Sequence, residues 1–303
     1  MNHSSDELIS QSRIIVVGTV RNVDKSIEGE IHRLNRAVAK FKSVSFFIVE
    51  SDSQDETIAA LERLEKTVKN FHYITLGDLR NSIPNRIARL SKARNAYVDY
   101  VKVNKAEFDY VLVADLDGVN IAINDEKIAT SFEKLGWGAC TANQIGPYYD
   151  IYALRAKNWS ETDCWAHAKS LIKDGVHPAM AWRLAIRDKQ RKIDPDESWI
   201  EVDSAFGGLA IYATEAFCLG AYSADSKREK SVSEHVSFHE FLRDAGWSIY
   251  INPKMTNFDY NEHNDFHRIS RRLKFAIKSL ISLTLPRFFI LKIMPDLDEK
   301  RVD

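Results

Sequence analysis

Asp115 and Asp117 are the residues of this chain whose type and spacing most directly predict chemistry. They follow the apolar run Tyr110 to Ala114 and precede Gly118, in the sequence FDYVLVADLDG. A short run rich in β-branched and aromatic residues is typical of a buried strand, and residues two apart on a strand leave on the same side, here roughly 6–7 Å apart. Such a pair can hold a hard divalent cation, Mn²⁺ or Mg²⁺, that would neutralise a diphosphate. The alternative is a solvated turn, since Asp-Gly is a common turn sequence.

The elements that must position this pair alternate between strand and helix patterns. In the first half, strands are predicted over 13–18, 44–49, 71–76 and 110–114, and helices over 25–42, 86–103 and a segment that carries Ile58, Leu61, Leu64 and Val68 after a cap at Asp52 or Ser53. This βαβαβ order predicts an α/β fold with a parallel sheet and right-handed crossovers. Ligands bind such sheets at the carboxyl ends of the strands, where the two acids would lie.

The second half is less regular. The stretch 174–198 is polar and stays unassigned, and Pro253 is expected to end the last strand. The predicted elements are a strand over 137–142, a helix over 159–173, a glycine loop at 207–208 that enters a strand, a helix over 234–245 and a strand over 248–251.

Three further constellations could meet a phosphate or a nucleoside. Arg21 follows the first strand, and an arginine there can offer its planar fork to a phosphate, although a surface salt bridge is the alternative. Acids and hydroxyls follow the second strand in the stretch 50–57, where they could bind ribose or cap the next helix. The third constellation lies on the predicted helix over 86–103 and consists of Arg86, Arg89, Lys92, Arg94 and Asn95. These residues could form a diphosphate site, or they could be a solvated helix face.

The order of these features resembles the GT-A fold glycosyltransferases, and the resemblance implies a GT-A, Rossmann-like α/β fold with a mixed, mainly parallel sheet flanked by helices. The segment 147–155, PYYDIYALR, resembles one in the fungal capsule-associated mannosyltransferases, and related bacterial polysaccharide glycosyltransferases look similar. The resemblance covers about residues 13–260. It implies that Asp117 is the principal metal ligand and that Asp115 contacts ribose or supports the metal. For the remaining residues it implies nucleoside contacts for Glu50 and Asp52, phosphate contacts for Arg89, Arg94 and Asn95, a sugar or acceptor pocket at Tyr149, Asp150 and Arg155, and close backbone approach at Gly207 and Gly208.

Glu234 begins a helix pattern in the sequence SEHVSFHEFL, which is similar to the acid-acid helix start of inverting family 2 glycosyltransferases. This chain has Glu-His where that family has two acids. The helix dipole favours an ionised Glu234, which suits a general base, with Asp150 as the second candidate. His235 and His239 are spaced i, i+4 and form a candidate metal pair, while a capping glutamate with two incidental histidines is the alternative. Further candidate metal ligands are His263 and His267.

Bulk properties set limits on other classes. The net charge of −1 gives no electrostatic reason to expect nucleic acid, and three widely spaced cysteines indicate a reducing compartment rather than a disulfide framework. The N-terminal stretch 1–12 is read as a polar tail without a secretory signal, and a cytoplasmic location is expected. The segment 261–303 is read as a basic, amphipathic helical appendage. Its part 265–294 is predicted to meet an anionic membrane surface, or else the domain itself or a second subunit.

The predicted function is transfer of a hexose-type sugar from a UDP- or GDP-linked donor to a hydroxyl of a glycan or lipid-linked saccharide, as in capsule or lipopolysaccharide synthesis. A GDP-mannose donor follows from the resemblance only, and the stereochemical outcome stays open between inversion and retention. The rival hypotheses are a metal-dependent phosphoesterase and a non-catalytic glycan-binding protein. A nucleotidyltransferase fits less well because the first strand lacks a glycine-rich phosphate loop.

Overall fold

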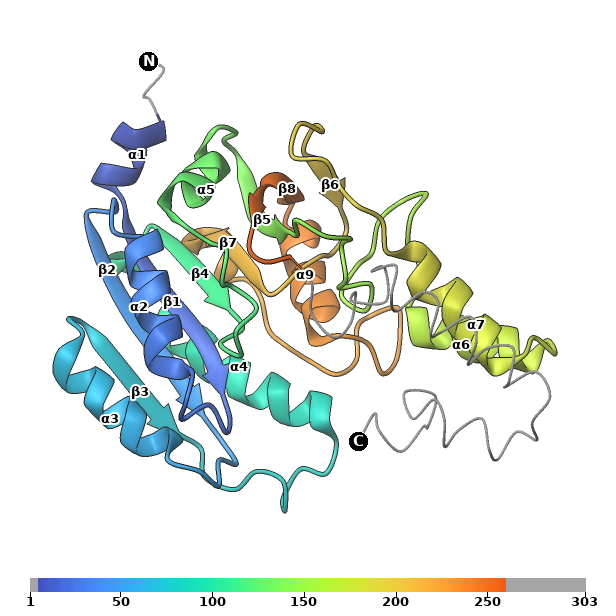
Figure 1. The fold of residues 1–303 in the computed structure, drawn as a ribbon, viewed down its shortest axis with the longest axis horizontal. Coiled ribbons are helices and arrows are strands. Elements are labelled where there is room, and N and C mark those ends of the chain that lie inside the picture. The colour runs from blue at the N-terminus through green and yellow to red at the C-terminus, as the bar shows by residue number, and fades with distance from the viewer. Residues whose placement is uncertain (1–4, 260–303) are drawn as a thin grey trace.

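In the computed structural model, the protein is built around one twisted sheet that runs through the molecule (Figure 1). The structure describes residues 5–259, and residues 1–4 and 260–303 lie outside the described part. The sheet has eight strands in the order β3-β2-β1-β4-β7-β5-β8-β6. Four of its strand pairs are parallel, and the β4–β7, β5–β7 and β6–β8 pairs are antiparallel. The predicted α/β class with a mixed, mainly parallel sheet is therefore confirmed.

The first half forms because strand and helix periodicities alternate along it. Odd and even residues of β1 point to opposite faces, so that Ile15 and Val17 enter one buried cluster while Ile14 and Val16 enter the other. Helix α4 covers the first face, and α2 with α3 covers the second. The elements are α1 (Ser5–Gln11), β1 (Arg13–Val20), α2 (Ile27–Ala37), β2 (Ser43–Glu50), α3 (Thr57–Thr67), β3 (Phe71–Thr75), α4 (Arg86–Val103) and β4 (Tyr110–Ala114), with a 3₁₀ turn at Lys105–Glu107.

The second half completes the sheet and adds a helical pair, α6 and α7, at one end (Figure 1). Because β7 runs antiparallel between β4 and β5, its first residue Leu209 pairs with Ala114, the last residue of β4. The loop before β7 is thereby brought to the edge where Asp115 leaves the sheet. The elements are α5 (Asp125–Ala129), β5 (Trp137–Asn143), α6 (Cys164–Lys173), α7 (Pro178–Ala185), β6 (Ile200–Val202), β7 (Leu209–Ala213), α8 (Thr214–Phe217), α9 (Glu234–Asp244) and β8 (Ser248–Thr256), with 3₁₀ turns at Thr130–Phe132 and Arg187–Lys189.

Two local predictions were wrong, and one stretch without a prediction is now assigned. The tail 1–12 contains helix α1, whose Ile9 is buried against the domain. Strand β8 continues past Pro253, because the register of its pairing with β5 shifts there and the proline carbonyl accepts a hydrogen bond from Asn143 Nδ2 at 2.9 Å. The unassigned stretch contains α7, which begins with a proline at its first position.

The start of α3 also differs from the predicted cap. Neither Asp52 nor Ser53 caps the helix, since Asp52 adopts a left-handed conformation with φ of 60° and its Oδ1 accepts from the backbone of Leu79 and Arg80. The Thr57 amide donates to Asp55 Oδ1 at 3.1 Å instead. The loop after β2 is therefore shaped by contacts with the loop after β3.

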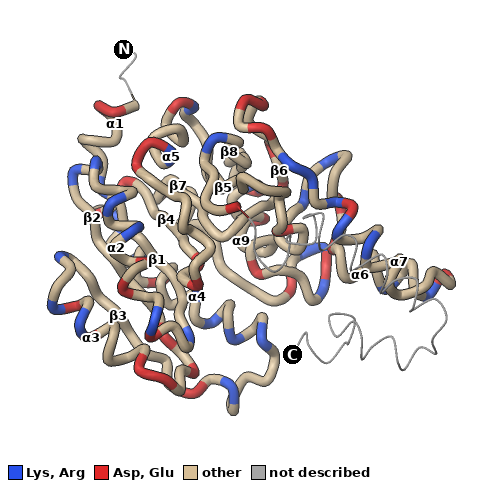
Figure 2. The backbone as a smooth tube through the Cα atoms, viewed as in Figure 1, with Lys and Arg blue, Asp and Glu red and all other residues tan. Residues whose placement is uncertain are grey.

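Charges of both signs are interspersed along the described chain (Figure 2). A group of basic residues marks the beginning of α4, where the chain enters from the loop after β3. Within the described residues, none of the helices is both long enough and apolar enough to cross a bilayer. The appendage 261–303, with His263 and His267, falls outside the described residues, so the membrane role predicted for 265–294 stays a prediction.

Candidate active site

One cavity of about 570 Å³ opens where β1, β2 and β4 end and where α4 and α9 begin. Helices α4 and α9 each precede a strand that runs parallel to β1, so their N-termini come to the same edge of the sheet as the strand ends. The cavity brings together ten of the predicted site residues, namely Arg21, Asp52, Arg89, Arg94, Asp115, Asp117, Tyr149, Asp150, Glu234 and His235.

Arg94 organises the wall of this cavity. Its side chain is 4% exposed, and it pairs with Asp115 Oδ1 at 3.0 Å and with Glu234 Oε1 at 3.1 Å. Its Nη1 also donates to the Tyr97 hydroxyl at 3.1 Å. The guanidinium thus joins the acid at the end of β4 to the acid at the start of α9. Its charge is paired within the protein, and the prediction that Arg94 neutralises phosphate stays a prediction.

Asp115 and Asp117 differ in their surroundings. Burial raises the pKa of Asp115 to about 7, opposed by Arg94 and increased further by repulsion from Asp117 and Asp150. The Asp115 amide donates to Gly208 O at 3.0 Å, which fixes the backbone where β4 ends. Asp117 is exposed at the rim of the cavity. The two carboxylates therefore offer oxygen atoms to the same space, with Asp117 the more accessible.

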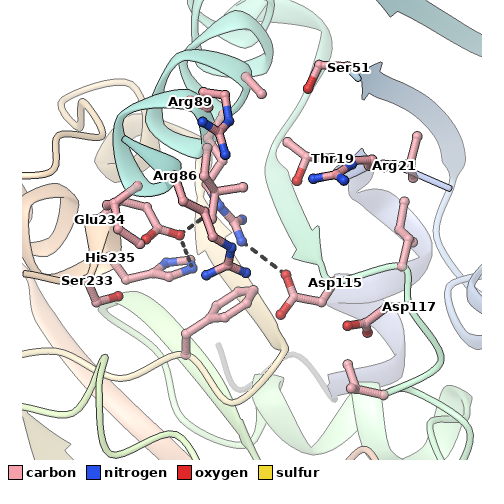
Figure 3. Close-up of a pocket in the computed structure, with 18 of the residues that line it drawn as sticks. Thr19, Arg21, Ser51, Arg86, Arg89, Asp115, Asp117, Ser233, Glu234 and His235 are labelled. Carbon is pink, nitrogen blue, oxygen red and sulfur yellow. Dashed lines mark hydrogen bonds and ion pairs between the residues drawn. The ribbon is translucent and has the colours of Figure 1, made fainter. Parts of the chain in front are cut away.

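The other arginines that line the cavity differ in burial and in hydrogen bonding. Arg89 is buried, and its Nη1 donates to the carbonyls of Ile83 and Pro84 at 2.7 and 2.5 Å, so it supports the loop before α4. Arg21 and Arg86 are exposed side chains that line the cavity, and within the described residues neither has an ion pair. Arg86 reaches from the first turn of α4 toward the centre of the cavity (Figure 3). Among the described residues that line the cavity, Arg21 and Arg86 are the cations available to an anionic ligand.

Four predicted site residues serve structural roles outside this cavity. Arg155 pairs with Asp163 at 3.2 Å and with Glu229 at 2.7 Å and is buried between them. Both amide atoms of Asn95 bond the backbone of Tyr222. Their predicted contacts with a sugar or a phosphate were wrong, because their polar groups are used within the protein. The other two residues are Gly207 and Gly208.

The two glycines are required by packing. They have φ values of 70° and 84°, and a Cβ at Gly208 would lie 2.8 Å from Val119 Cγ2. Gly207 donates its amide to Asp150 Oδ2 at 3.0 Å. Neither glycine is among the residues that line the cavity, and the predicted approach of their backbone to a sugar stays a prediction.

Glu50 and Asp52 lie beside the main cavity. Glu50 is buried, accepts a hydrogen bond from the Ser53 amide at 2.9 Å and contacts the Thr75 hydroxyl. It lines a neighbouring hollow of about 380 Å³, and Asp52 lines both spaces. The predicted nucleoside contact of Asp52 stays a prediction, while Glu50 is displaced from the main cavity by its own buried contacts.

The predicted histidine metal pair was wrong. His239 lies behind the cavity, and its two ring nitrogens bond the Ser204 hydroxyl at 2.9 Å and the Tyr212 hydroxyl at 3.0 Å. Burial lowers the pKa of His239 to about 3. Only His235 of the pair lines the cavity, where it stacks on Phe206. In the described part of the chain, no three or more His, Cys, Asp or Glu residues are grouped so that they could hold a metal ion.

Sequence reasoning missed several residues of the cavity wall. Arg86 was recognised as part of a charged helix but not as a site residue, although it precedes Arg89 by one helical turn. Phe206 precedes the glycine pair and carries His235 on its ring face. The other missed lining residues include Thr19, Ser51, Tyr152 and Ser233.

No family model matches this sequence, and no curated protein matches it. Solved structures with a similar arrangement include a mannosyltransferase from Pyrobaculum calidifontis in complex with GDP-Man and Mn²⁺ (15% identity, 95% of this chain and 70% of that chain, TM-score 0.47). Others are S. aureus TarS 1-349 with UDP-GlcNAc (14%, 94% and 71%, 0.47) and glucosyl-3-phosphoglycerate synthase from Mycobacterium tuberculosis with UDP (11%, 89% and 79%, 0.41). At these identities and TM-scores, the likeness assigns neither a family nor a substrate to this chain, and the resemblance to the fungal mannosyltransferases stays a prediction.

Proposed function

We propose that this protein is a metal-dependent glycosyltransferase that moves a hexose-type sugar from a UDP- or GDP-linked donor to a hydroxyl of a glycan or lipid-linked saccharide. The observation that carries this proposal is the composition of one cavity. It combines the carboxylates of Asp115 and Asp117, the buried carboxylate of Glu234, and Arg21 and Arg86, which have no ion pair within residues 5–259. A volume of about 570 Å³ lies within the range of small-molecule sites.

The donor diphosphate would lie between the free arginines and the acid pair. An arginine fork can bind phosphate oxygens through two hydrogen bonds. Electrostatic groups fixed in place before reaction stabilise the charge that grows on a departing diphosphate, and this is often the largest catalytic term. Arg21 and Arg86 would supply this stabilisation from the ends of β1 and the start of α4.

The acid pair fits a Mn²⁺ or Mg²⁺ ion that is shared with the substrate. Magnesium is usually held by one or two carboxylates together with substrate phosphates and water, rather than by a cage of protein ligands alone. Asp117 would be the main ligand because it is exposed at the rim, with Asp115 beside it. When bound, the ion would neutralise the charge of the diphosphate.

Glu234 is the carboxylate best placed to assist removal of the proton from the acceptor hydroxyl. It stands at the N-terminus of α9, and Arg94 Nε lies 3.1 Å from its Oε1. Asp150 is less suited, since its two oxygens accept hydrogen bonds from the amides of Gly207 and Ala153 at 3.0 and 3.2 Å. Direct action of Glu234 on the acceptor would give an inverted product.

A thermal-shift panel tests this proposal. The full chain is titrated with UDP-, GDP- and CMP-sugars, each with and without Mn²⁺. We expect one UDP- or GDP-sugar to raise the melting temperature only when Mn²⁺ is present, because ligand binding to the folded state stabilises it. No stabilisation by any nucleotide sugar would contradict the proposal. Hydrolysis of phosphate esters without nucleotide-sugar binding would support a phosphoesterase instead.

A further inference from the structure

His235 is held rigidly in the wall of the cavity. Its ring lies flat on Phe206, with centroids 3.8 Å apart and planes 18° apart, and meets the edge of Tyr222 at 5.5 Å. The side chain is 4% exposed, yet it lines the cavity beside Glu234 (Figure 3). These contacts fix the direction of both ring nitrogens before any ligand arrives.

Neither ring nitrogen of His235 has a hydrogen-bond partner within the described residues. His239, one helical turn later, uses both of its nitrogens in hydrogen bonds to hydroxyl groups. A buried polar group without a partner is costly, and such groups call for an explanation in a native fold. Because His235 lines the cavity, a hydroxyl-bearing ligand is the partner that its position supplies.

The groups around His235 decide its protonation. Burial lowers the pKa of His235 well below its usual value, and the charge of Arg94 and the neighbouring His239 act in the same direction. The ring is therefore neutral, with one nitrogen that donates and one that carries a lone pair. Glu234 Oε1 lies 3.8 Å from Nε2, so its carboxylate would stabilise a positive charge that formed on the ring during a reaction.

We propose that His235 accepts the proton of the attacking hydroxyl and that Glu234 stabilises the imidazolium that forms. This inference rests on the proposed glycosyl transfer. The acceptor oxygen bonds to the anomeric carbon as its proton moves to the imidazole lone pair. The bond between the anomeric carbon and the diphosphate oxygen breaks, and the nucleoside diphosphate leaves with the electron pair. The imidazolium then returns its proton to solvent.

The test measures nucleoside diphosphate release by the full chain, with water, free mannose and free glucose as acceptors and the nucleotide sugar that stabilises the wild type as donor. The variants are His235→Gln, which keeps polar atoms but accepts no proton, and His235→Phe, which keeps the stacking. His239→Gln is the matched control from the same helix. Donor affinity and melting temperature are measured for each protein.

We expect both His235 variants to lose about 10²- to 10⁴-fold in kcat, as for removal of a general base, with donor affinity and melting temperature close to wild type. The control should lose melting temperature while keeping its turnover per folded molecule. Wild-type turnover in both His235 variants would overturn the inference, as would a loss of turnover that merely follows a loss of folding or of donor binding. Absence of donor binding or of release in the wild type would instead contradict the proposed function itself.

Discussion

The cavity wall and the interior behind it contain the same types of polar residue in different states. The cavity wall consists of Arg94, Asp115, Glu234 and His235, and the interior group of Arg155, Asp163, Glu229 and His239. Both regions hold a buried arginine between two carboxylates. In the interior, both nitrogens of the histidine are bonded within the protein, whereas in the wall the histidine nitrogens have no partner among the described residues. The comparison shows that unused bonding capacity beside a cavity, more than residue type, indicates a functional group.

Replacement of Glu234 by glutamine should give the largest effect, and it should fall on activity. The amide keeps the size of the carboxylate, whose Oε1 lies 3.1 Å from Arg94 Nε, but it carries no negative charge. Turnover should fall about 10²- to 10⁴-fold in a nucleotide-release assay. Glu240→Gln is the matched control, because Glu240 is a buried glutamate of the same helix that bonds the Lys227 amide away from the cavity. Equal turnover in the Glu234→Gln and Glu240→Gln variants would contradict a catalytic role for Glu234.

Replacement of Arg155 by methionine should give the next largest effect, and it should fall on stability. The change leaves Asp163 and Glu229 without their cation, which for a buried pair costs about 3 kcal/mol. Urea unfolding would measure this loss. Turnover per folded molecule should equal that of the wild type. A selective loss of donor or acceptor binding would contradict the structural role and indicate that Arg155 contacts a ligand.

The interior histidine should make stability depend on pH. His239 has a pKa of about 3 in the folded protein and about 6.5 in an unfolded chain, so the unfolded state binds more protons as pH falls. The stability that this histidine contributes is present above pH ~6.5 and is lost as pH falls toward 3, with about 2 kcal/mol lost between pH 7 and pH 5. Unfolding curves of the wild type and His239→Gln are measured at both pH values. Between pH 7 and pH 5, the free energy of unfolding should fall by about 2 kcal/mol more for the wild type than for the variant. An identical pH dependence would contradict the assigned state of His239.

The smallest effect should come from Arg86. Arg86→Gln removes an exposed cation that lines the cavity and has no ion pair within the described residues, so stability should change by less than about 0.5 kcal/mol. Donor Kd should rise by about tenfold or less, measured by calorimetry with Mn²⁺. Arg36→Gln, an exposed arginine in the last turn of α2, is the control and should leave Kd unchanged. Equal Kd values for the two variants would exclude Arg86 from donor binding.

The sequence predicted what local periodicity determines. Alternation along β1 and β4 placed Asp115 at a strand end, and the helix pattern placed Glu234 at the start of α9, as observed. It failed where a partner lies far away in sequence. Glu229, which is 74 residues from Arg155 in the sequence, accepts a hydrogen bond from that arginine and occupies its side chain. No local sequence pattern predicts such a pair.

The same limit applies to the glycines and to the two histidines of α9. Gly207 and Gly208 look available to a ligand in the sequence, but their positive φ values and their close neighbours Ala142 and Val119 show that they serve packing. His235 and His239 look equivalent at i, i+4. Which of them faces the cavity depends on the packing of α9 against the loop before β7, which the helix pattern alone does not specify.

Calorimetric titration of Mn²⁺-dependent donor binding to the wild type and to Asp117→Asn tests the central claim most directly. Asp117 is exposed at the rim, so its replacement should leave the melting temperature unchanged, and Asp196→Asn at another exposed aspartate serves as the control. We predict that the wild type and the control bind a UDP- or GDP-sugar only with Mn²⁺, and that Asp117→Asn loses at least tenfold in affinity. Equal, metal-independent binding by all three proteins would contradict a metal site at the end of β4.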